Sequence, residues 1–475
     1  MGEELCQLTA MELRALVACR EISPVEVTEA AIRRAKQLQP RLNCLMTICE
    51  DQAMEAARSA EKAVLRGELL GLLHGVPFTC KDVINTRGVR TTFGSRLFEN
   101  NVPEADAEVV ARLRNQGAIL IGKTTTSEFA AKCLTDAPLF GSTRNAWSAA
   151  HTSGGSSGGT AVAVAAGITP IGIATDGGGS TRIPASCNGV VGLKQSVGLV
   201  PHSQTDDLYG EITYVTPMSR TVADTALMLQ AMAGEHPGDP WSIGSRPQDY
   251  VGAASSKAGL KGKRILFCAA PKGRPISAEV DAAFRSSLAH LRALGAELME
   301  MSSENFNIEP MWRTINHTVW RANYAELARD HADLLSPSFL KQMALVTDVS
   351  GVEYQKAMFD RTQLFRYIQS LFVSADLLVM PTLSRTALPI DQDLFGTIEI
   401  DGKIYPEVRP NWFPWTMPFN LTGHPAISIP CGFGKHGLPI GIQMVGRFRQ
   451  DAELLGAAAV LEKSLGLIDR RPAFD

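Results

Sequence analysis

The stretch HTSGGSSGGTAVAVAAGITPIGIATDGGGSTRIPASCNGVVGLKQSVG (151–198) is the part of the sequence around which the rest of the chain is organised. It holds two clusters of glycine and serine, GGSSGG (154–159) and DGGGS (176–180), separated by a predicted small-residue helix and a β-branched strand. Glycine lets a backbone approach a ligand closely, and successive free N–H groups in such a turn form an anion-binding concavity. Ser180, at the end of the second cluster, therefore lies beside donors that can stabilise an oxyanion.

Other interpretations of these motifs fit their context less well. GGSSGG is typical of flexible linkers, but TAVAVAAG follows directly, and a linker does not lead into a helix and a strand. The cluster also matches the G-x-S-x-G nucleophile elbow around Ser156, which requires a strand immediately before it. The preceding RNAWSAAHTS is polar and irregular, so the elbow is rejected. An S-x-x-K match at Ser59 lies in an amphipathic helical pattern and is interpreted as a solvated face.

The composition is that of a globular enzyme with a large core. The chain has 475 residues, 45% hydrophobic and 20% charged, with a net charge of −3. This charge gives no reason to expect binding to nucleic acid or to a membrane surface. Nine scattered cysteines without a C-x-x-C pair favour reduced thiols and argue against a zinc site. The acidic start and the lack of an apolar run of about 18 residues make the cytoplasm the expected compartment.

Predicted strands alternate with predicted helices along the chain. Ser23-Pro24-Val25-Glu26 is a capping box that opens a helix to about residue 38, and a second helix ends at Gly67. The alternation predicts an α/β fold with one domain, built on a large mixed, mostly parallel β-sheet with helices on both faces. Strands are predicted at 71–83, 118–123, 264–269, 296–301, 376–381, 426–433 and 440–446.

The same pattern suggests how the chain is divided. Residues 1–67 are predicted to form a helical segment packed on the core, and residues 68–475 the main domain. The motifs of that domain concentrate at about 68–240, while 241–475 would complete the sheet and form the substrate pocket. Candidates for an apolar pocket are the aromatic residues Trp412, Phe413, Trp415 and Phe419, although such stripes more often belong to a core.

Lys81 lies near the end of an apolar strand, GLLHGVPFTCKDV (71–83). Burial lowers the pKa of a lysine, and a neutral lysine can act as a base. Taken alone, Lys81 is better explained by a buried stem whose ammonium group reaches water or pairs with Asp82. The catalytic interpretation gains weight only when Lys81 is considered together with the two glycine and serine clusters.

Together these three segments resemble the amidase signature family. Ser156 follows Lys81 by 75 residues and precedes Ser180 by 24, in agreement with the spacing of that family. The resemblance covers about residues 60–240 and continues more thinly to the end, and it implies the amidase-signature fold with 68–475 as the amidase domain. The motifs that carry it are GVPFTCKDV, SGGSSGG, TDGGGSTRIPASCNGVVGLK, GKTTTSEFA, FGSTRNAW, TPMSRTVADTALMLQAMAG, HPAISIPCGF and GLPIGIQMVG.

The resemblance implies a Ser–cis-Ser–Lys triad. Ser180 would be the nucleophile that forms an acyl-enzyme, and neutral Lys81 would be the general base. Ser156, following a cis peptide bond from Gly155, would relay protons between Ser180, the leaving nitrogen and Lys81. No cofactor, metal or histidine is implied.

Further roles follow from the same resemblance. Asp176 and Arg182 would support the catalytic loop without touching substrate, and Ser157 would help to hold Lys81. The chain departs from the family at Gly177, where a side chain is usual, and at Gln195, where proline is frequent. The residues whose N–H groups would form the oxyanion hole are Gly177, Gly178, Gly179 and Ser180.

The implied activity is hydrolysis of the C–N bond of a small carboxamide, such as an apolar or aryl amide or an anilide, to a carboxylate and ammonia or an amine. The alternative is the glutaminase subunit of a glutamyl-tRNA(Gln)/aspartyl-tRNA(Asn) amidotransferase. That subunit usually carries SSLDQIGP where this chain has GEITYVTPMS (210–219). An inactive binding protein is disfavoured because the triad positions are intact, and a thiol hydrolase using Cys80 or Cys187 lacks a histidine motif. The expected partner is the amide substrate, and the sequence leaves open whether the chain forms a homodimer.

Overall fold

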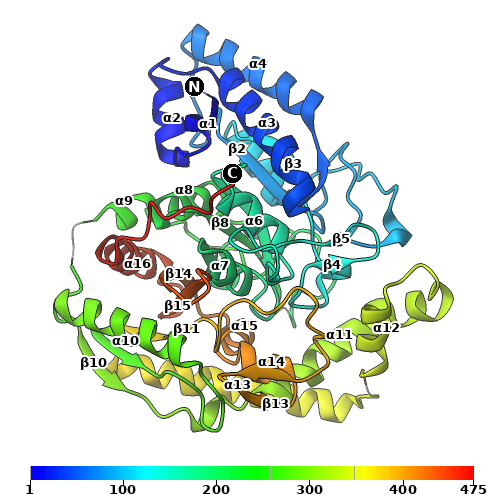
Figure 1. Cartoon of the computed structure of the whole chain (residues 1–475), viewed down its shortest axis with the longest axis vertical. Coiled ribbons are helices and arrows are strands. Elements are labelled where there is room, and N and C mark those ends of the chain that lie inside the picture. Colours follow the sequence, from blue (N-terminus) through cyan, green and yellow to red (C-terminus); the bar gives the residue numbers. More distant parts are fainter. Residues whose placement is uncertain (1, 211, 257–258, 347, 475) are drawn as a thin grey trace.

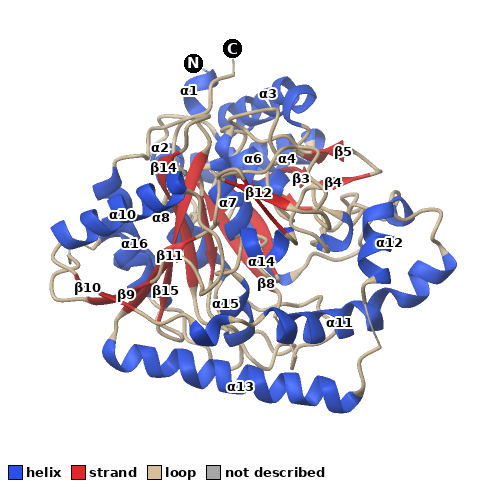
Figure 2. Cartoon of the chain, turned by 60° about the horizontal axis from the view of Figure 1, so that its bottom comes forward, coloured by secondary structure: helices blue, strands red, loops and turns tan. Residues whose placement is uncertain are grey.

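An eleven-stranded β-sheet forms the centre of the molecule, with helices packed around it (Figures 1 and 2). The structure, a computed structural model, describes residues 2–210, 212–256, 259–346 and 348–474. In spatial order the strands are β1 (Leu45–Ile48), β3 (Ile119–Thr124), β2 (Pro77–Lys81), β6 (Ile171–Asp176), β8 (Tyr214–Ser219), β7 (Val191–Lys194), β14 (Ala426–Phe433), β15 (Pro439–Gly446), β11 (Leu377–Pro381), β9 (Arg264–Phe267) and β10 (Glu297–Glu300). The small pairs β4 (Asp136–Ala137) with β5 (Gly141–Ser142) and β12 (Ile398–Ile400) with β13 (Lys403–Tyr405) lie outside it.

The sheet is mixed, as expected, but it is not mostly parallel. In the described part of the chain, β2 is parallel to β3 and β6, and β9 is parallel to β10 and β11. The other six pairs of this sheet are antiparallel. A short connection such as 434–438 between β14 and β15 can join only antiparallel neighbours, whereas a parallel pair needs a long crossover. The prediction overestimated the parallel share because it treated each alternation of strand and helix as such a crossover.

The helices begin and end close to the predicted limits. The capping box at Ser23 is present, and the helix of residues 50–66 ends at Gly67 with φ of +70°. The helices that surround the sheet are α1 (Gly2–Leu5), α2 (Ala10–Ala18), α3 (Pro24–Leu42), α4 (Glu50–Arg66), α5 (Glu108–Asn115), α6 (Gly158–Ala165), α7 (Arg182–Asn188), α8 (Val222–Met232), α9 (Tyr250–Ser255), α10 (Ala278–Ala293), α14 (Val408–Trp412), α15 (Met417–Thr422) and α16 (Asp451–Leu465).

The segment between β10 and β11 forms a helical insert at one edge of the molecule, along the bottom and right of Figure 2. Its helices are α11 (Glu309–Asp330), α12 (Pro337–Ala344) and α13 (Gly351–Ser374). Tryptophan and asparagine side chains of α11 line a cavity, and α13 packs against α11 and α15. Within the described residues, no helix is long and apolar enough to cross a membrane.

Two parallel neighbours, β2 and β6, place the candidate catalytic residues. Lys81 is the last residue of β2, and Asp176 is the last residue of β6. All residues of both strands are buried, including the charged Lys81 and Asp176 at their ends. Because the carboxyl ends of parallel strands meet at the same edge of a sheet, Lys81 and the loop from Asp176 to Ser180 lie together.

Candidate active site

Lys81 lies at the centre of a buried hydrogen-bonded group. Its side chain is fully buried, and Nζ lies 2.7 Å from Ser156 Oγ and 2.7 Å from Thr175 Oγ1. Burial lowers the pKa of Lys81 well below its usual value, and the nearby carboxylate of Asp176 opposes this shift without cancelling it. This shift makes the neutral amine, the form that a general base requires, easier to reach.

Ser156 is held in front of α6 by a crowded loop. The Gly155–Ser156 peptide bond is cis, as the resemblance implied. A Cβ added at Gly155 would lie 2.8 Å from the backbone of Cys133, so only glycine fits there. Thr135 Oγ1 donates a hydrogen bond of 2.8 Å to the carbonyl of Gly154 and lies 3.3 Å from that of Ser156. These contacts fix the direction in which Ser156 Oγ approaches Lys81.

Ser157 is linked to Lys81 through Thr175. Its Oγ donates to the carbonyl of Thr175 (3.1 Å) and accepts from the Thr175 N–H (3.3 Å). Ser157 thus positions Thr175, whose hydroxyl is the second partner of Lys81. Thr175 was not among the predicted site residues, although the position of β6 beside β2 and the alternation of side chains along a strand could have indicated it.

The glycine loop before Ser180 turns its carbonyl groups toward other parts of the protein. The carbonyl of Gly178 accepts a hydrogen bond of 2.6 Å from Thr416 Oγ1, and that of Gly177 accepts one of 3.4 Å from Trp312 Nε1. Gly179 has φ of +126°, and a Cβ there would lie 2.5 Å from Thr416 Oγ1. The loop therefore needs glycine at this position, both for its conformation and for its close contact.

The predicted oxyanion hole is changed at one position. The N–H of Gly179 donates to Asp176 Oδ1 at 2.7 Å, so this donor is engaged inside the protein. In the described part of the chain, no hydrogen bond from the N–H groups of Gly177, Gly178 or Ser180 is present. These three groups remain the expected donors to a substrate oxygen.

Asp176 and Arg182 form a fully buried ion pair behind the loop. Arg182 Nη2 and Nε lie 2.9 Å from the two carboxylate oxygens, and its other hydrogens reach Asn420, Gln443 and the carbonyl of Thr416. Burial alone would raise the pKa of Asp176, but the charge and hydrogen bonds of Arg182 reverse this and bring the pKa to about 2. Neither side chain lines the substrate cavity, in keeping with the supporting role expected for both.

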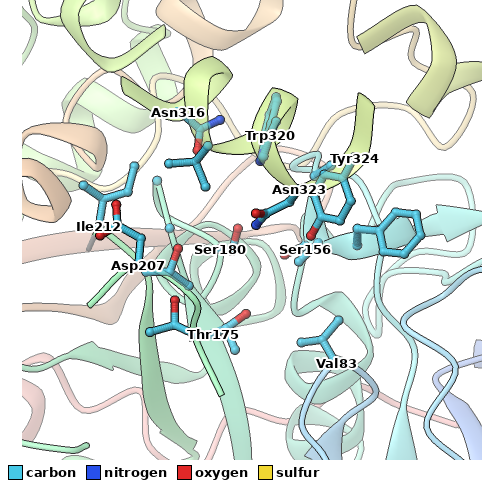
Figure 3. A pocket seen from close by; sticks show the side chains of 18 of the residues that line it. Val83, Ser156, Thr175, Ser180, Asp207, Ile212, Asn316, Trp320, Asn323 and Tyr324 are labelled. Carbon is cyan, nitrogen blue, oxygen red and sulfur yellow. The ribbon is translucent and has the colours of Figure 1, made fainter. Parts of the chain in front are cut away.

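Ser156 and Ser180 open into one cavity of about 470 Å³ (Figure 3). Their hydroxyls are not hydrogen-bonded to each other in this structure, and such catalytic contacts often tighten only when substrate is bound. Of the four aromatic residues considered as pocket candidates, only Phe413 lines the cavity, while the other three are buried in the core. Residues of α11 on the cavity wall are Trp312, Asn316, Thr318, Val319, Trp320, Ala322, Asn323 and Tyr324.

Among the described residues, no group of three or more His, Cys, Asp or Glu side chains is placed to hold a metal ion. The cysteines considered as alternative nucleophiles are also unsuited to that role. Burial raises the pKa of the Cys80 thiol, and it raises that of Cys187 as well. A thiol that resists ionisation is a poor nucleophile.

Several known proteins resemble this chain over nearly its whole length. Residues 26–455 match the family described as Amidase. An acylamidase from Rhodococcus erythropolis is 34% identical over 480 residues, covering 99% of this chain and 98% of the relative. One subunit of the glutamyl-tRNA(Gln) amidotransferase from a Synechococcus strain is 35% identical over 486 residues, covering 95% of each chain. The crystal structure of a bacterial aryl acylamidase of the amidase signature family matches with a TM-score of 0.90 at 27% identity, covering 98% of this chain and 99% of that chain.

The chain therefore belongs to the amidase signature family. Its fold is the one expected from the sequence, an α/β domain with a central mixed sheet flanked by helices. Members of this family are hydrolases that act on amide C–N bonds, and this chain is one of them.

Proposed function

We propose that the chain hydrolyses a small apolar or aryl amide without a protein partner, using Ser180 as nucleophile, Ser156 as proton relay and Lys81 as general base. The observation that carries this proposal is the position of the fully buried Lys81 Nζ at 2.7 Å from Ser156 Oγ, with Ser156 and Ser180 on one cavity. A lysine with a lowered pKa can accept a proton through Ser156 when Ser180 attacks.

The first half of the reaction forms an ester on Ser180. Ser180 Oγ bonds to the amide carbon as its proton passes to Ser156, whose own proton passes to Lys81. The carbonyl oxygen becomes an oxyanion, which the N–H groups of Gly177, Gly178 and Ser180 stabilise. Ser156 then gives one proton to the amide nitrogen and takes one back from Lys81, the C–N bond breaks, and ammonia or an amine leaves.

The second half releases the acid. A water molecule loses a proton along the same relay and bonds to the ester carbon, forming a second oxyanion in the same hole. When this intermediate collapses, the bond to Ser180 Oγ breaks and that oxygen takes a proton back. The products are the carboxylate and regenerated enzyme.

An apolar or aryl substrate is favoured by the composition of the cavity wall. Phe93, Phe129, Trp320 and Tyr324 all line it, together with Val83 and Ile84. Aromatic and aliphatic side chains contribute to binding mainly by removing apolar substrate surface from water.

The second candidate is the glutaminase component of a tRNA-dependent amidotransferase. It is favoured by the relative of this class at 35% identity, a value similar to that of the acylamidase. Against it, residues 210–219 lack the SSLDQIGP motif usual in that component.

The two functions differ in what the isolated chain can do. The purified protein is assayed for ammonia or amine release from a panel of anilides, alkyl amides and glutamine. We expect turnover of apolar or aryl amides and little of glutamine. Efficient glutaminase activity that appears only when the other amidotransferase components are added would replace the first candidate by the second.

A further inference from the structure

The substrate cavity has two sides that are separated by Ser180. In Figure 3, Ser156 and Tyr324 lie on one side of Ser180, and Ile212 and Asp207 on the other. The contacts agree with this division. Thr135 Oγ1 lies 3.3 Å from the carbonyl of Ser156, which ties the segment that begins at Phe129 to the Ser156 side.

On the opposite side, the glycine loop contacts residues around β8. A Cβ added at Gly177 would lie 3.0 Å from Thr213 Oγ1, and Asn420 Nδ2 donates to the carbonyls of Asp176 (2.8 Å) and Ile212 (3.1 Å). The oxyanion donors and the segment 212–214 thus lie on the side away from Phe129.

An aromatic group is concentrated on the Ser156 side. The Phe129 and Tyr324 rings are stacked, with centroids 4.8 Å apart and planes inclined by 27°. Phe339 packs behind them at 5.0 Å from Phe129 and is nearly fully buried, and Trp320 packs on the same cluster. Phe129, Tyr324 and Trp320 line the cavity and are only partly buried, so one surface of the group remains open to a ligand.

The backbone of this wall is held in an uncommon conformation. Phe93, Phe129 and Ala130 have φ of +54°, +50° and +57°, a region that residues other than glycine seldom adopt. All three line the cavity, and the N–H of Phe129 donates to the carbonyl of Phe93 at 2.8 Å. Such conformations persist where the surrounding structure enforces them, and they concentrate at ligand clamps and active sites. These three residues therefore mark the wall as a candidate surface for binding a ligand.

Reaction geometry assigns each side of the cavity to one part of the substrate. The relay serine must reach the departing nitrogen, so the amine substituent lies on the Ser156 side, whereas the oxyanion donors hold the carbonyl oxygen and leave the acyl substituent toward Ile212. We propose that Phe129, Tyr324 and Trp320 form the leaving-group subsite, and that the preferred substrate is an amide whose amine carries an aromatic ring. This assignment rests on the proposed function, because it requires Ser156 to deliver the proton to nitrogen.

The test compares aromatic with saturated rings of similar size on each side of the amide. The first pair of substrates is N-benzylpropanamide and N-(cyclohexylmethyl)propanamide, and the second is phenylacetamide and cyclohexylacetamide. In the first pair the aromatic substrate should be favoured in kcat/KM by roughly tenfold, the equivalent of one good aromatic contact. In the second pair the ratio should be near one.

Variants then locate the contact. Tyr324→Leu should reduce the benzyl preference to near one. If that variant fails to fold, Trp320→Leu provides the same test and should also reduce the preference. Tyr354→Leu is the matched control, because Tyr354 also lines the cavity. Its side chain lies beside Gly210, since a Cβ added at Gly210 would be 3.1 Å from the Tyr354 hydroxyl. The N–H of Gly210 donates to Asp207, which places this control on the opposite side. Tyr354→Leu should leave the benzyl preference intact.

The possible results separate this inference from the proposed function. A preference for the aromatic ring on the acyl pair, removed by Tyr324→Leu, would reverse the assignment of the two sides. A benzyl preference that survives both Tyr324→Leu and Trp320→Leu would overturn the subsite while leaving the amidohydrolase intact. If the isolated wild-type chain hydrolyses none of the four amides or the wider panel, the proposed function itself fails.

Discussion

The catalytic edge of the sheet and the helical insert are held in place by different interactions. At the catalytic edge, Lys81, Ser156 and Arg182 are fully buried, and each has hydrogen-bond partners within the protein. In the insert, Trp320 and Tyr324 are partly exposed and are placed mainly by aromatic contacts. Directional bonds in a dry interior tolerate little displacement, whereas stacked rings can shift and still remain in contact. Substitutions at the edge should therefore change rate, and substitutions in the insert should change selectivity.

The largest effect is expected from Ser180→Ala. Removing the nucleophile should lower kcat by roughly 10⁴-fold or more, because the acyl-enzyme cannot form. Thermal unfolding should be little changed, since the Ser180 side chain makes no hydrogen bond to another described residue. Steady-state hydrolysis and a melting curve on the same preparation test both points. Near-normal turnover would remove Ser180 from the mechanism.

Lys81 should give the next largest loss and a characteristic pH profile. The lysine works only when neutral, so kcat/KM should rise with pH through its pKa, which burial places well below 10.5. Lys81→Met should abolish this rising limb and most activity. Lys81→Arg should also fail, because a guanidinium stays protonated in this range. An arginine variant with nearly normal rates would show that position 81 supplies a charge and not a base.

Asp176→Asn tests the buried ion pair as a structural element. It leaves the Arg182 charge buried without its partner and should lower the free energy of unfolding by about 3–5 kcal/mol. Because the folded-state pKa of Asp176 is about 2, below its usual 3.8, the stabilisation is present above pH 3.8 and is lost as pH falls toward 2.

The control for Asp176→Asn is Asp330→Asn. Asp330 forms an exposed pair with Arg329, which solvent screens, so urea unfolding should show no measurable change. Equal losses in the two variants would contradict the contrast between a buried and an exposed ion pair.

Thr175→Val should have a smaller effect on catalysis. It keeps the shape of the side chain but removes the hydroxyl at 2.7 Å from Lys81 Nζ, so kcat/KM should fall by roughly tenfold, the equivalent of one hydrogen bond. The pH at the midpoint of the rising limb should move at the same time. Thr175→Ser retains the hydroxyl and should restore most of the rate. If valine and serine behave alike, the hydroxyl does not position Lys81.

The smallest effect is expected on the outer face of the insert. Phe359 on α13 is 60% exposed and does not line the cavity. Phe359→Ser should leave kcat/KM and the preference between benzyl and cyclohexylmethyl amides unchanged. A clear change in either value would show that the insert acts on the site through its solvent face as well as through α11.

The sequence predicted the catalytic edge better than the cavity. The segments around Lys81, Ser156 and Ser180 could be recognised only together, because three short motifs in this order and at this spacing resemble the amidase signature family. Thr416 and Asn420 could not be recognised in this way, because they reach the glycine loop from more than 200 residues away along the chain. The tryptophans at 412 and 415 illustrate the same limit, since an aromatic stripe has the same appearance in a core as in a pocket.

The hydrogen bond from Trp312 Nε1 to the carbonyl of Gly177 has a consequence for exchanging parts between related enzymes. The triad is supplied by residues before 181, whereas much of the cavity wall belongs to α11. Exchanging the segment 309–374 between related enzymes is therefore an obvious way to change substrate specificity. Such a chimera would also replace the indole that braces the glycine loop. A donor segment without a tryptophan at the position of Trp312 would alter the oxyanion donors together with the substrate range, and retaining this one residue should keep the two properties separable.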